Sequence, residues 1–379
     1  MKKYFVFLGI AALTLAACTK TEIDETAIPD QKIEFNVASY VPQTRADNYV
    51  SLVKETTTFS TMAYLHAEGV NTVQNYFGDN GETITADNAT NPSAWLPSHD
   101  YYWPKSKKSY INFVSWYDNG GKPTIDKTAK TMTWSERTIA TTDNIMFADV
   151  AWHYNTNTTS DENNTMFGAS GVFGQNQVKA GVPTLFHHAL SKLEIQAQCN
   201  PVEKADSKDA SKKTTWDVTL ENIKITDTYN AGTLALTVTE PTLPDPIVGK
   251  TSPWTGSWAT SGTASGITMA NTSTLTTELV DVLAEQSVLP QSLANAKLKF
   301  DLHIITKFAG TQYSEEKIPV EVALKTLGTS PITEWKMNYK YLYKIIVNPE
   351  TTTVQFDPAV IEWVEDTNAP TYNVPTGQI

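Results

Sequence analysis

Residues 32–40 read KIEFNVASY, and the apolar residues Ile33, Phe35 and Val37 alternate there with polar ones. Successive side chains of a strand point to opposite faces of a sheet, so this alternation predicts a β-strand with one buried face. Residues 109–118, SYINFVSWYD, repeat the pattern with larger aromatic side chains. Both stretches indicate a protein built on β-sheet.

Similar short segments follow along the chain, separated by the Gly, Asn, Asp and Pro residues that are typical of turns. They lie at residues 131–136, 144–152, 191–198, 216–226, 232–238, 297–306, 317–324, 339–347 and 353–363. Many short strands with turns between them predict an all-β fold of β-sandwiches, and 379 residues are enough for two. Residues 276–286, TTELVDVLAEQ, are the best candidate for a helix.

Two polar segments, residues 173–183 and 200–213, are candidate boundaries between the sandwiches. We place the boundary after residue 182, because strand series of similar size then lie on both sides. This choice gives an N-terminal domain of residues 46–182 and a C-terminal domain of residues 183–379. Residues 200–213 then form a long hairpin loop, and the Pro-, Gly-, Ser- and Thr-rich residues 239–266 form a surface insertion.

The N-terminus has the parts of a secretion signal. Lys2 and Lys3 precede an apolar run of residues 4–17, which is too short to span a membrane comfortably. The run ends in residues 15–18, LAAC, which resemble the lipobox of bacterial lipoproteins. We therefore expect residues 1–17 to be a signal peptide and Cys18 to carry lipid such as palmitate. An ordinary signal peptide with an incidental cysteine is the alternative.

Composition excludes several classes of partner. The net charge of −12 argues against nucleic acid and against anionic membrane surfaces. Once Cys18 is lipidated, Cys199 has no second cysteine to pair with, and its strand-like surroundings predict a buried small side chain.

Residue patterns typical of catalysis are missing from the sequence. His187 and His188 are adjacent, so an undistorted strand directs them to opposite faces, where they cannot share a metal. No metalloprotease, nucleophile-elbow or phosphate-loop motif occurs, and residues 160–164, SDENN, match no calcium-loop spacing. We expect no enzyme activity, no catalytic residue, no metal and no cofactor. The Trp residues occupy positions at which core packing is the default interpretation.

Arginine is scarce, since the 29 Lys and Arg residues include only Arg45 and Arg137. Arg45 lies in the polar segment 42–48, directly after the first predicted strand. An exposed linker is the natural target of a protease that cuts after arginine. An ordinary surface arginine is the other interpretation of Arg45, and composition alone favours it.

The order of several motifs resembles the fimbrillin family, whose members are type V pilin subunits derived from lipoproteins. The lipobox, the first strand and the Thr44-Arg45-Ala46 step are followed by residues 101–118 and by NIMFADV at 144–150. Residues 185–195, LFHHALSKLEI, resemble the most specific family motif. Residues 287–293 and 332–347 resemble its closing elements.

The resemblance implies two tandem transthyretin-like β-sandwich domains and a route to polymers. A protease would cut between Arg45 and Ala46 and remove the propeptide, residues 18–45. Its strand, with Ile33, Phe35 and Val37, would leave a groove that a C-terminal strand of another subunit fills. The candidate donor is the region 351–363, with Val354, Phe356, Val360 and Ile361 or Trp363 as its apolar residues; a fixed final strand of the second sandwich is the alternative.

The expected partners are therefore other fimbrial subunits and, in the precursor, the outer membrane through the lipid on Cys18. A host or bacterial surface ligand is a further candidate, with residues 239–266 as one place for it. The alternative function is a surface lipoprotein that keeps its lipid and never polymerises, acting as an anchor pilin or as an adhesin for glycan or host ligand.

Overall fold

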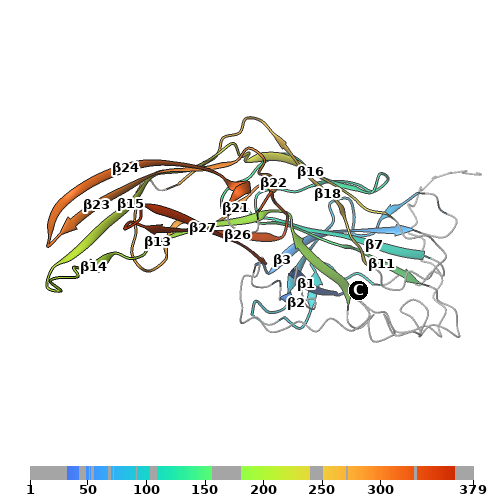
Figure 1. The fold of residues 1–379 in the computed structure, drawn as a ribbon. Coiled ribbons are helices and arrows are strands. Elements are labelled where there is room, and N and C mark those ends of the chain that lie inside the picture. The colour runs from blue at the N-terminus through green and yellow to red at the C-terminus, as the bar shows by residue number, and fades with distance from the viewer. Residues whose placement is uncertain are drawn as a thin grey trace, which may run out of the picture.

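The computed structural model describes residues 32–41, 48–50, 52, 55–66, 70, 72–90, 92–102, 109–155, 181–239, 251–269, 272–327 and 331–362. Within these residues the regular structure is β-strand, apart from a 3-10 turn at Leu324–Thr326. Figure 1 shows an elongated molecule, with β14, β23 and β24 at one end and β1, β7 and β11 at the other.

The N-terminal half is organised around a closed ring of strands. In order around the ring these are β7 (Ser109–Asp118), β10 (Ile145–Ala148), β12 (Val182–His188), β1 (Phe35–Val41), β6 (Trp95–Pro97), β5 (Glu82–Ala86) and β3 (Thr58–His66), which pairs again with β7. Four further strands extend the sheet outside this ring: β2 (Asn48–Val50), β4 (Gln74–Asn75), β11 (Val150–Asn155) and β17 (Thr251–Ser252).

The ring has two apolar faces, because successive side chains of its strands point alternately inward and outward and apolar residues occur on both sides. On β7, Phe113 points into the ring while Val114 and Trp116 point outward. A second sheet covers the outward face; its strands are β18 (Thr255–Ser261), β16 (Ala231–Thr237), β9 (Thr131–Thr138) and β8 (Thr124–Asp126). Segments that lie 100 residues apart in sequence therefore share one core, in which Trp134 and Leu234 are buried.

The C-terminal half is a sandwich of two sheets. One contains β21 (Val280–Val288), β13 (Ser191–Cys199), β26 (Tyr339–Asn348) and β27 (Thr353–Glu362). The other contains β14 (Glu203–Ala205), β15 (Lys213–Thr226), β23 (Lys297–Phe308) and β24 (Thr311–Ala323), with β19 (Ile267–Thr268) and β20 (Thr272–Thr274) beside β15. A small pair, β22 (Gln291–Ser292) and β25 (Glu334–Trp335), completes the fold.

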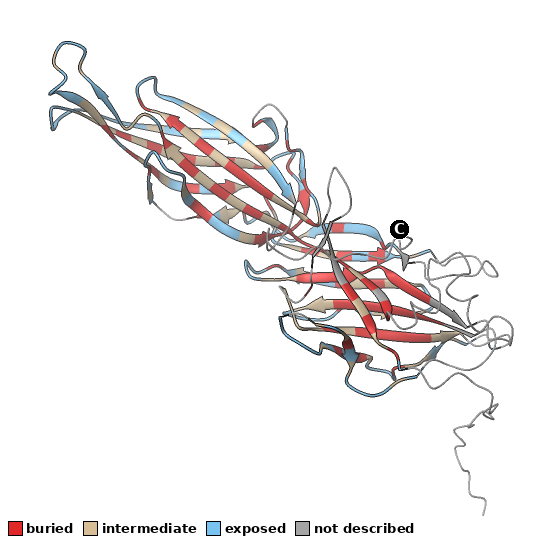
Figure 2. Ribbon diagram, turned by 90° about the horizontal axis from the view of Figure 1, so that it is seen from below, coloured by how far each residue is buried: buried red, intermediate tan, exposed pale blue. Residues whose placement is uncertain are grey.

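Strands that line both cores alternate buried and less buried residues, as the sequence pattern indicated. Figure 2 shows buried residues along the strands of both halves, interrupted by less buried ones. On β23, Leu298, Phe300, Leu302 and Ile304 are buried and the residues between them are not. The all-β, sandwich-like architecture expected from the sequence is confirmed, and Cys199 is buried in the C-terminal core as expected.

Residues 276–286, the best helix candidate in the sequence, do not form a helix. Residues 280–288 form β21, which pairs antiparallel with β13 from Ser191↔Val288 to Ala197↔Val280. Val282 and Leu283 are buried in the C-terminal core. Burial and pairing with β13 outweigh the local helical preference of Leu, Ala, Glu and Gln in this segment.

The segment 239–266 does more than decorate the surface. Trp254 and Trp258 are buried in the core between the ring and its covering sheet. Their indole Nε1 atoms donate hydrogen bonds to Ala148 O at 2.9 Å and Ala189 O at 2.6 Å. The boundary that we placed after residue 182 falls at the start of β12, a strand of the ring.

Candidate functional site

The first described strand, β1, closes the ring with its apolar side chains turned inward. Ile33, just before the strand, is 1% exposed, and Phe35 and Val37 are 2% and 5% exposed. Phe35 lies against an aromatic cluster, with ring centroids 5.8 Å from Phe59 and 5.5 Å from Phe113, both edge to face. The sequence alternation thus becomes a row of three side chains that fills the inside of the ring.

Burial of this row is the main attachment of β1. A large apolar side chain contributes about 1.5–3 kcal/mol when fully buried, so three contribute roughly 5–9 kcal/mol as an upper estimate. The two edge-to-face ring contacts of Phe35 add to that value. A segment held this firmly needs either covalent change or a competing strand before it leaves.

On one side, the main chain of β1 pairs continuously with β12. It runs parallel to β12, from Phe35↔Val182 to Ser39↔Phe186. On the other side it meets β6 at a single pair, Phe35↔Trp95, and β2 at three pairs. Loss of β1 would open the ring between β12 and β6 and leave an edge of β12 without its partner.

Gly181 lets β12 begin close beside β1. Its φ is +87°, and a Cβ at this position would lie 2.8 Å from Glu34 O. The next amide, Val182 N, donates to the same carbonyl at 2.6 Å. A larger residue at position 181 would push the two strands apart, so this glycine belongs to the slot that holds β1.

The predicted donor, β27, is the last strand of the C-terminal sheet and pairs with β26 along its whole length, from Tyr339↔Glu362 to Asn348↔Thr353. Val354 and Phe356 are half-buried against the C-terminal core. Val360 and Ile361 are exposed by 52% and 40%. One half of the strand is thus packed on its own domain, and the other half presents apolar side chains to solvent.

The edge strand of the opposite sheet differs from β27. Along β24, Glu315, Glu316, Lys317, Pro319 and Glu321 occur within seven residues. Charged residues and proline on an edge discourage pairing with another chain. The described residues of β27 carry only Asp357, Pro358 and Glu362 of these types, so β27 is the less protected edge.

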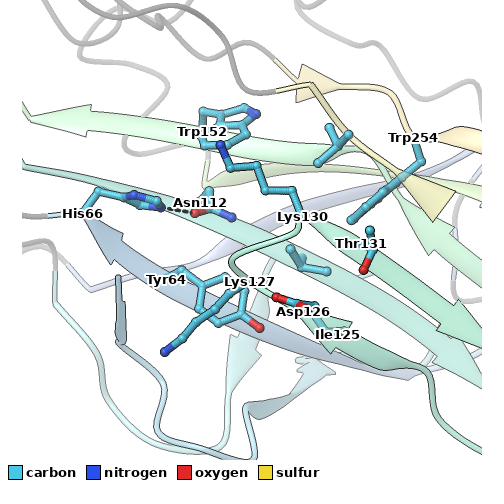
Figure 3. A pocket seen from close by; sticks show the side chains of 12 residues that line it. Tyr64, His66, Asn112, Ile125, Asp126, Lys127, Lys130, Thr131, Trp152 and Trp254 are labelled. Carbon is cyan, nitrogen blue, oxygen red and sulfur yellow. Dashed lines mark hydrogen bonds between the residues drawn. The ribbon is translucent and has the colours of Figure 1, made fainter. Parts of the chain in front are cut away.

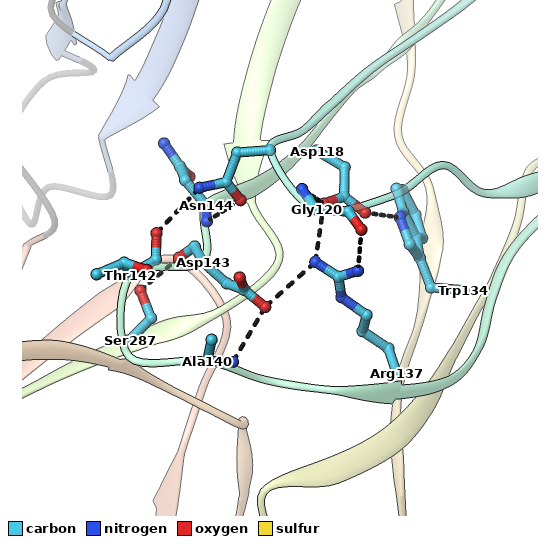
Figure 4. Close-up of polar contacts among 10 residues, drawn as sticks. Asp118, Gly120, Trp134, Arg137, Ala140, Thr142, Asp143, Asn144 and Ser287 are labelled. Atoms are coloured by element: carbon cyan, nitrogen blue, oxygen red, sulfur yellow. Dashed lines mark hydrogen bonds and ion pairs between the residues drawn. The ribbon is translucent and has the colours of Figure 1, made fainter.

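Arg137 is held inside the fold. Its side chain is 18% exposed, and its guanidinium donates to Gly120 O at 2.6 Å, to Asp118 Oδ1 at 3.1 Å and to Asp143 Oδ2 at 3.2 Å. Figure 4 shows the two carboxylates and the Gly120 carbonyl around it, with Trp134 also bonded to Asp118. A Cβ on Gly120 would collide with the guanidinium. Arg137 is therefore only partly exposed and is held by specific partners on all sides of its guanidinium.

A family model described as fimbrillin-like matches residues 44–363. The chain belongs to the fimbrillin-like family. The match spans both halves of the fold, from the segment after β1 to the end of β27. This membership makes the chain a pilus-related surface protein, as the motif order in the sequence predicted.

Solved structures to which the chain is weakly similar include a fimbrial protein from Bacteroides vulgatus, at 13% identity and TM-score 0.48, over 88% of this chain and 99% of the other. Another is the tip fimbrial protein Mfa3 from Porphyromonas gingivalis with C-terminal truncation, at 8% identity and TM-score 0.31, over 88% and 100%. These similarities are weak, so the family assignment rests on the sequence model. Among curated proteins no relative matches.

Three predicted site residues of this fimbrillin-like protein lie outside the described residues: Cys18, Arg45 and Ala46. Trp363, one candidate for the donor strand, and residues 160–164 lie outside them as well. Lipidation and cleavage therefore stay predictions. Of the slot and donor residues, the structure brings Ile33, Phe35 and Val37 together in one row and places the donor candidates on β27.

The adjacent histidines face opposite sides of β12, as predicted. His187 Nε2 lies 3.1 Å from Asp149 Oδ1, whereas the His188 side chain is fully buried, with Nε2 at 2.8 Å from Glu55 Oε1. Asn144 Nδ2 donates to Glu55 Oε2 at 2.9 Å, and Asn338 Oδ1 accepts from the His188 amide at 2.9 Å. This buried network joins the segment after β2 to the ring and to the turn before β26.

Glu55 stays ionised in that network. Burial alone would raise the pKa of its carboxyl group, but the charge and hydrogen bond of His188 and the hydrogen bond from Asn144 outweigh burial and lower the pKa. Sequence reasoning missed Glu55, because its partner His188 is 133 residues away. The paired histidines of the family motif were the only signal.

The described residues include no group of three or more His, Cys, Asp or Glu side chains arranged to hold a metal. Nor do they include a helix long and apolar enough to cross a membrane. The geometry around β1 and β27 is one of strand pairing and apolar burial.

Proposed function

We propose that this protein is a structural subunit of a cell-surface fimbria that polymerises by strand exchange and contributes to adhesion. The observation that carries the proposal is β1, which fills the ring with three buried apolar side chains and ends at Val41, four residues before Arg45. A removable strand of this kind creates an apolar slot and an unpaired strand edge when it leaves, and unpaired edges recruit strands.

The first step is delivery to the outer membrane as a lipoprotein. The lipobox and Cys18 support it, because the signal would be cut before the cysteine and lipid attached there. While the chain is anchored, β1 occupies the ring and prevents premature pairing. The anchor and the plug belong to one segment, residues 18–45, so one cut between Arg45 and Ala46 releases both.

Selective cutting at Arg45 is supported by the state of Arg137. A protease needs an extended, accessible chain, so a site held in a paired strand such as β9 must first unfold locally. Arg137 is locked by two carboxylates, a carbonyl and the Gly120–Gly121 turn. A protease specific for arginine would therefore be left with Arg45.

The strand that refills the slot comes from the C-terminal region of another subunit. Support comes from β27, which is an edge strand with alternating apolar residues and few protective charges. Such a contact is head to tail and builds an open filament. An incoming strand would replace both the apolar row of β1 and its main-chain pairing with β12.

The alternative is a surface lipoprotein that never polymerises, as an anchor pilin or a ligand-binding adhesin. One observation favours it: β27 is fully paired with β26, and Val354 and Phe356 pack on their own core. A strand bound in this way has to detach before it can be donated. In this alternative Cys18 and its lipid are retained.

The mass of protein sheared from the producing cells separates the two functions. We expect the sheared subunit to begin at Ala46 and to carry no lipid. An Arg45→Ala variant should fold, because β1 stays in place, but should form no fibres, while Arg137→Lys should form them normally. Sheared material that still carries lipidated Cys18 would contradict the polymerising subunit.

A further inference from the structure

Large apolar side chains stay exposed in three groups on the described part of the chain. Phe308 and Tyr313 lie at the end of the hairpin of β23 and β24, Val360 and Ile361 lie on β27, and Val70, Leu96 and Tyr102 belong to the N-terminal half. The proposed function uses only the group on β27. Exposed apolar groups that cluster mark interaction sites, so the other two groups call for a partner.

The first group lies at the far end of the C-terminal half, where Figure 1 shows the hairpin of β23 and β24. Tyr313 is 82% exposed, and a register shift between β23 and β24 leaves it without a paired residue. The strands are joined by a tight two-residue turn, in which Ala309 and Gly310 have φ of 47° and 83°. Phe308 and Tyr313, the hairpin pair, are thus aromatic side chains on a well-defined support.

The second group lies at the end of the ring where β1 begins. Lys32, which precedes β1, pairs with Tyr102. Phe35 pairs with Trp95, the neighbour of Leu96. Leu96 and Tyr102 are each 40% exposed. These two residues, the mouth pair, therefore flank the entrance through which the slot of β1 is reached.

The mouth pair lies at the end of the ring that points away from the C-terminal half. The strand β12 continues after two residues into β13, so β12 ends at the junction of the two halves and begins at the opposite end of the ring. Because β1 runs parallel to β12, it begins at that opposite end as well. The strand β3 runs against β1 and ends there, where His66 is hydrogen-bonded to Asn112 (Figure 3) and Val70 follows.

The hairpin pair lies beside the point from which β27 would be donated. The turn 349–352 joins β27 to β26, and Glu350 in this turn forms an ion pair with Lys204 of β14. Lys204 is paired with Thr214 of β15, which is paired with Phe308 of β23. Neighbouring strands are about 4.8 Å apart, so Phe308 lies roughly 10 Å from Lys204 along this row.

The direction of the donated strand brings the two pairs together. A detached β27 remains joined to its own subunit at the turn 349–352, so its first residue is the one nearest to the hairpin pair. When it takes the place of β1 in the same direction, that first residue stands at the mouth of the accepting ring. The reverse direction would bring the hairpin to the junction, where Ser287 of the C-terminal half already bonds to Thr141 and Asp143.

We propose that the hairpin pair of one subunit docks on the mouth pair of the next, as a second contact between copies of this chain beside the donated strand. The proposal rests on the strand exchange proposed above. Two copies with net charge −12 repel each other, so an apolar contact suits them better than a charged one. The contact fixes the angle between neighbouring subunits and holds the mouth close to the turn from which β27 is donated.

A photo-reactive phenylalanine analogue at Tyr313 tests this contact on producing cells. We expect sheared fibres to contain a cross-link from position 313 to residues 95–102 of another subunit, and the uncleaved Arg45→Ala variant to contain none. The same analogue at Phe59 reports strand exchange separately, through a cross-link to residues 351–363 of another subunit. A Phe59 cross-link without the Tyr313 cross-link would refute the hairpin contact and leave strand exchange standing. Absence of the Phe59 cross-link would overturn both.

Variants measure the contribution of the contact. Tyr313→Ser should reduce the amount of fibre per cell about tenfold, because an aromatic anchor in an interface is typically worth at least a factor of ten. Tyr313→Phe keeps the ring, so it is the matched control and should form fibres normally. Melting temperatures of the precursors should not change, since the side chain is exposed.

A double variant shows whether the two pairs meet. Tyr102→Ser should have the same effect as Tyr313→Ser, and the double variant should be no worse than either single one, because each removes the same contact. Normal fibres from Tyr313→Ser, or losses that multiply in the double variant, would contradict the proposal.

Discussion

Phe35→Ala is the perturbation that most sharply probes how β1 is held. The substitution removes a ring that is 2% exposed and that contacts Phe59 and Phe113 edge to face. Truncation of a buried Phe to Ala typically costs about 3–5 kcal/mol, because transfer free energy is lost and a cavity remains. We place the expected cost in the upper half of this range, since each aromatic contact is worth about 0.5–1.5 kcal/mol.

Urea or thermal unfolding of the full chain measures this loss. Asn36→Ala, on the same strand but with a side chain that is only partly buried, is the matched control and should change the free energy of unfolding by less than about 0.5 kcal/mol. After cleavage at Arg45 and removal of residues 18–45, variant and wild-type subunits have the same sequence and should have the same stability. A cost below about 1 kcal/mol for Phe35→Ala would refute the conclusion that β1 is anchored by its buried row.

Three further predictions concern the other features of the fold. Asp118→Asn removes a buried charge from Arg137, so an arginine-specific protease should cut the folded variant after Arg137 at least tenfold faster than the wild-type chain; equal rates would show that this part of β9 needs no ion pair for protection. Glu55→Gln should cost about 1–3 kcal/mol at pH 7 and flatten the pH dependence of stability in acid, measured by unfolding at several pH values. The pKa of Glu55 is lowered in the folded state, so its contribution is complete above its unfolded pKa of about 4.3 and is lost as pH falls through the folded value; an unchanged acid profile would contradict this assignment. Phe356→Ser should reduce fibre length on the cell surface, measured by electron microscopy, while normal fibres would exclude β27 as donor.

Much of the fold follows from periodicity. Alternation identified β1, β13, β23 and β26 correctly, because their buried side chains face one core on one side. On β7 both faces are buried, one inside the ring and the other against the covering sheet. The adjacent residues His187 and His188 were correctly assigned to opposite faces of one strand. Both results depend only on the two-residue repeat of a strand.

Elements that depend on distant partners could not be predicted in this way. The strand β21 has the composition of a candidate helix, but its conformation is fixed by β13, about 90 residues away in sequence. Trp254 and Trp258 lie in a segment rich in Pro, Gly, Ser and Thr, yet they complete the core of the N-terminal half. Arg137, on β9, acquires its carboxylate partners from the end of β7 and from the turn before β10.

In the candidate site, too, some features follow from local periodicity and others depend on distant partners. Ile33, Phe35 and Val37 were recognised from their own spacing and lie in one buried row. These residues close the ring because residues 35–39 of β1 pair in parallel with residues 182–186 of β12. No local sequence pattern predicts the pairing of β1 with β12. Nor does a local pattern predict the contact between Glu55 and His188.

The central claim is that a strand of another subunit takes the place of β1 inside the ring. A photo-reactive phenylalanine analogue at Phe59, which contacts Phe35 in the structure, reports the occupant of the slot directly. Mass spectrometry of cross-linked material should find residues 32–41 of the same chain attached in the precursor, and residues 351–363 of another subunit attached in sheared fibres. Cross-links to residues 32–41 in the fibres would contradict the account.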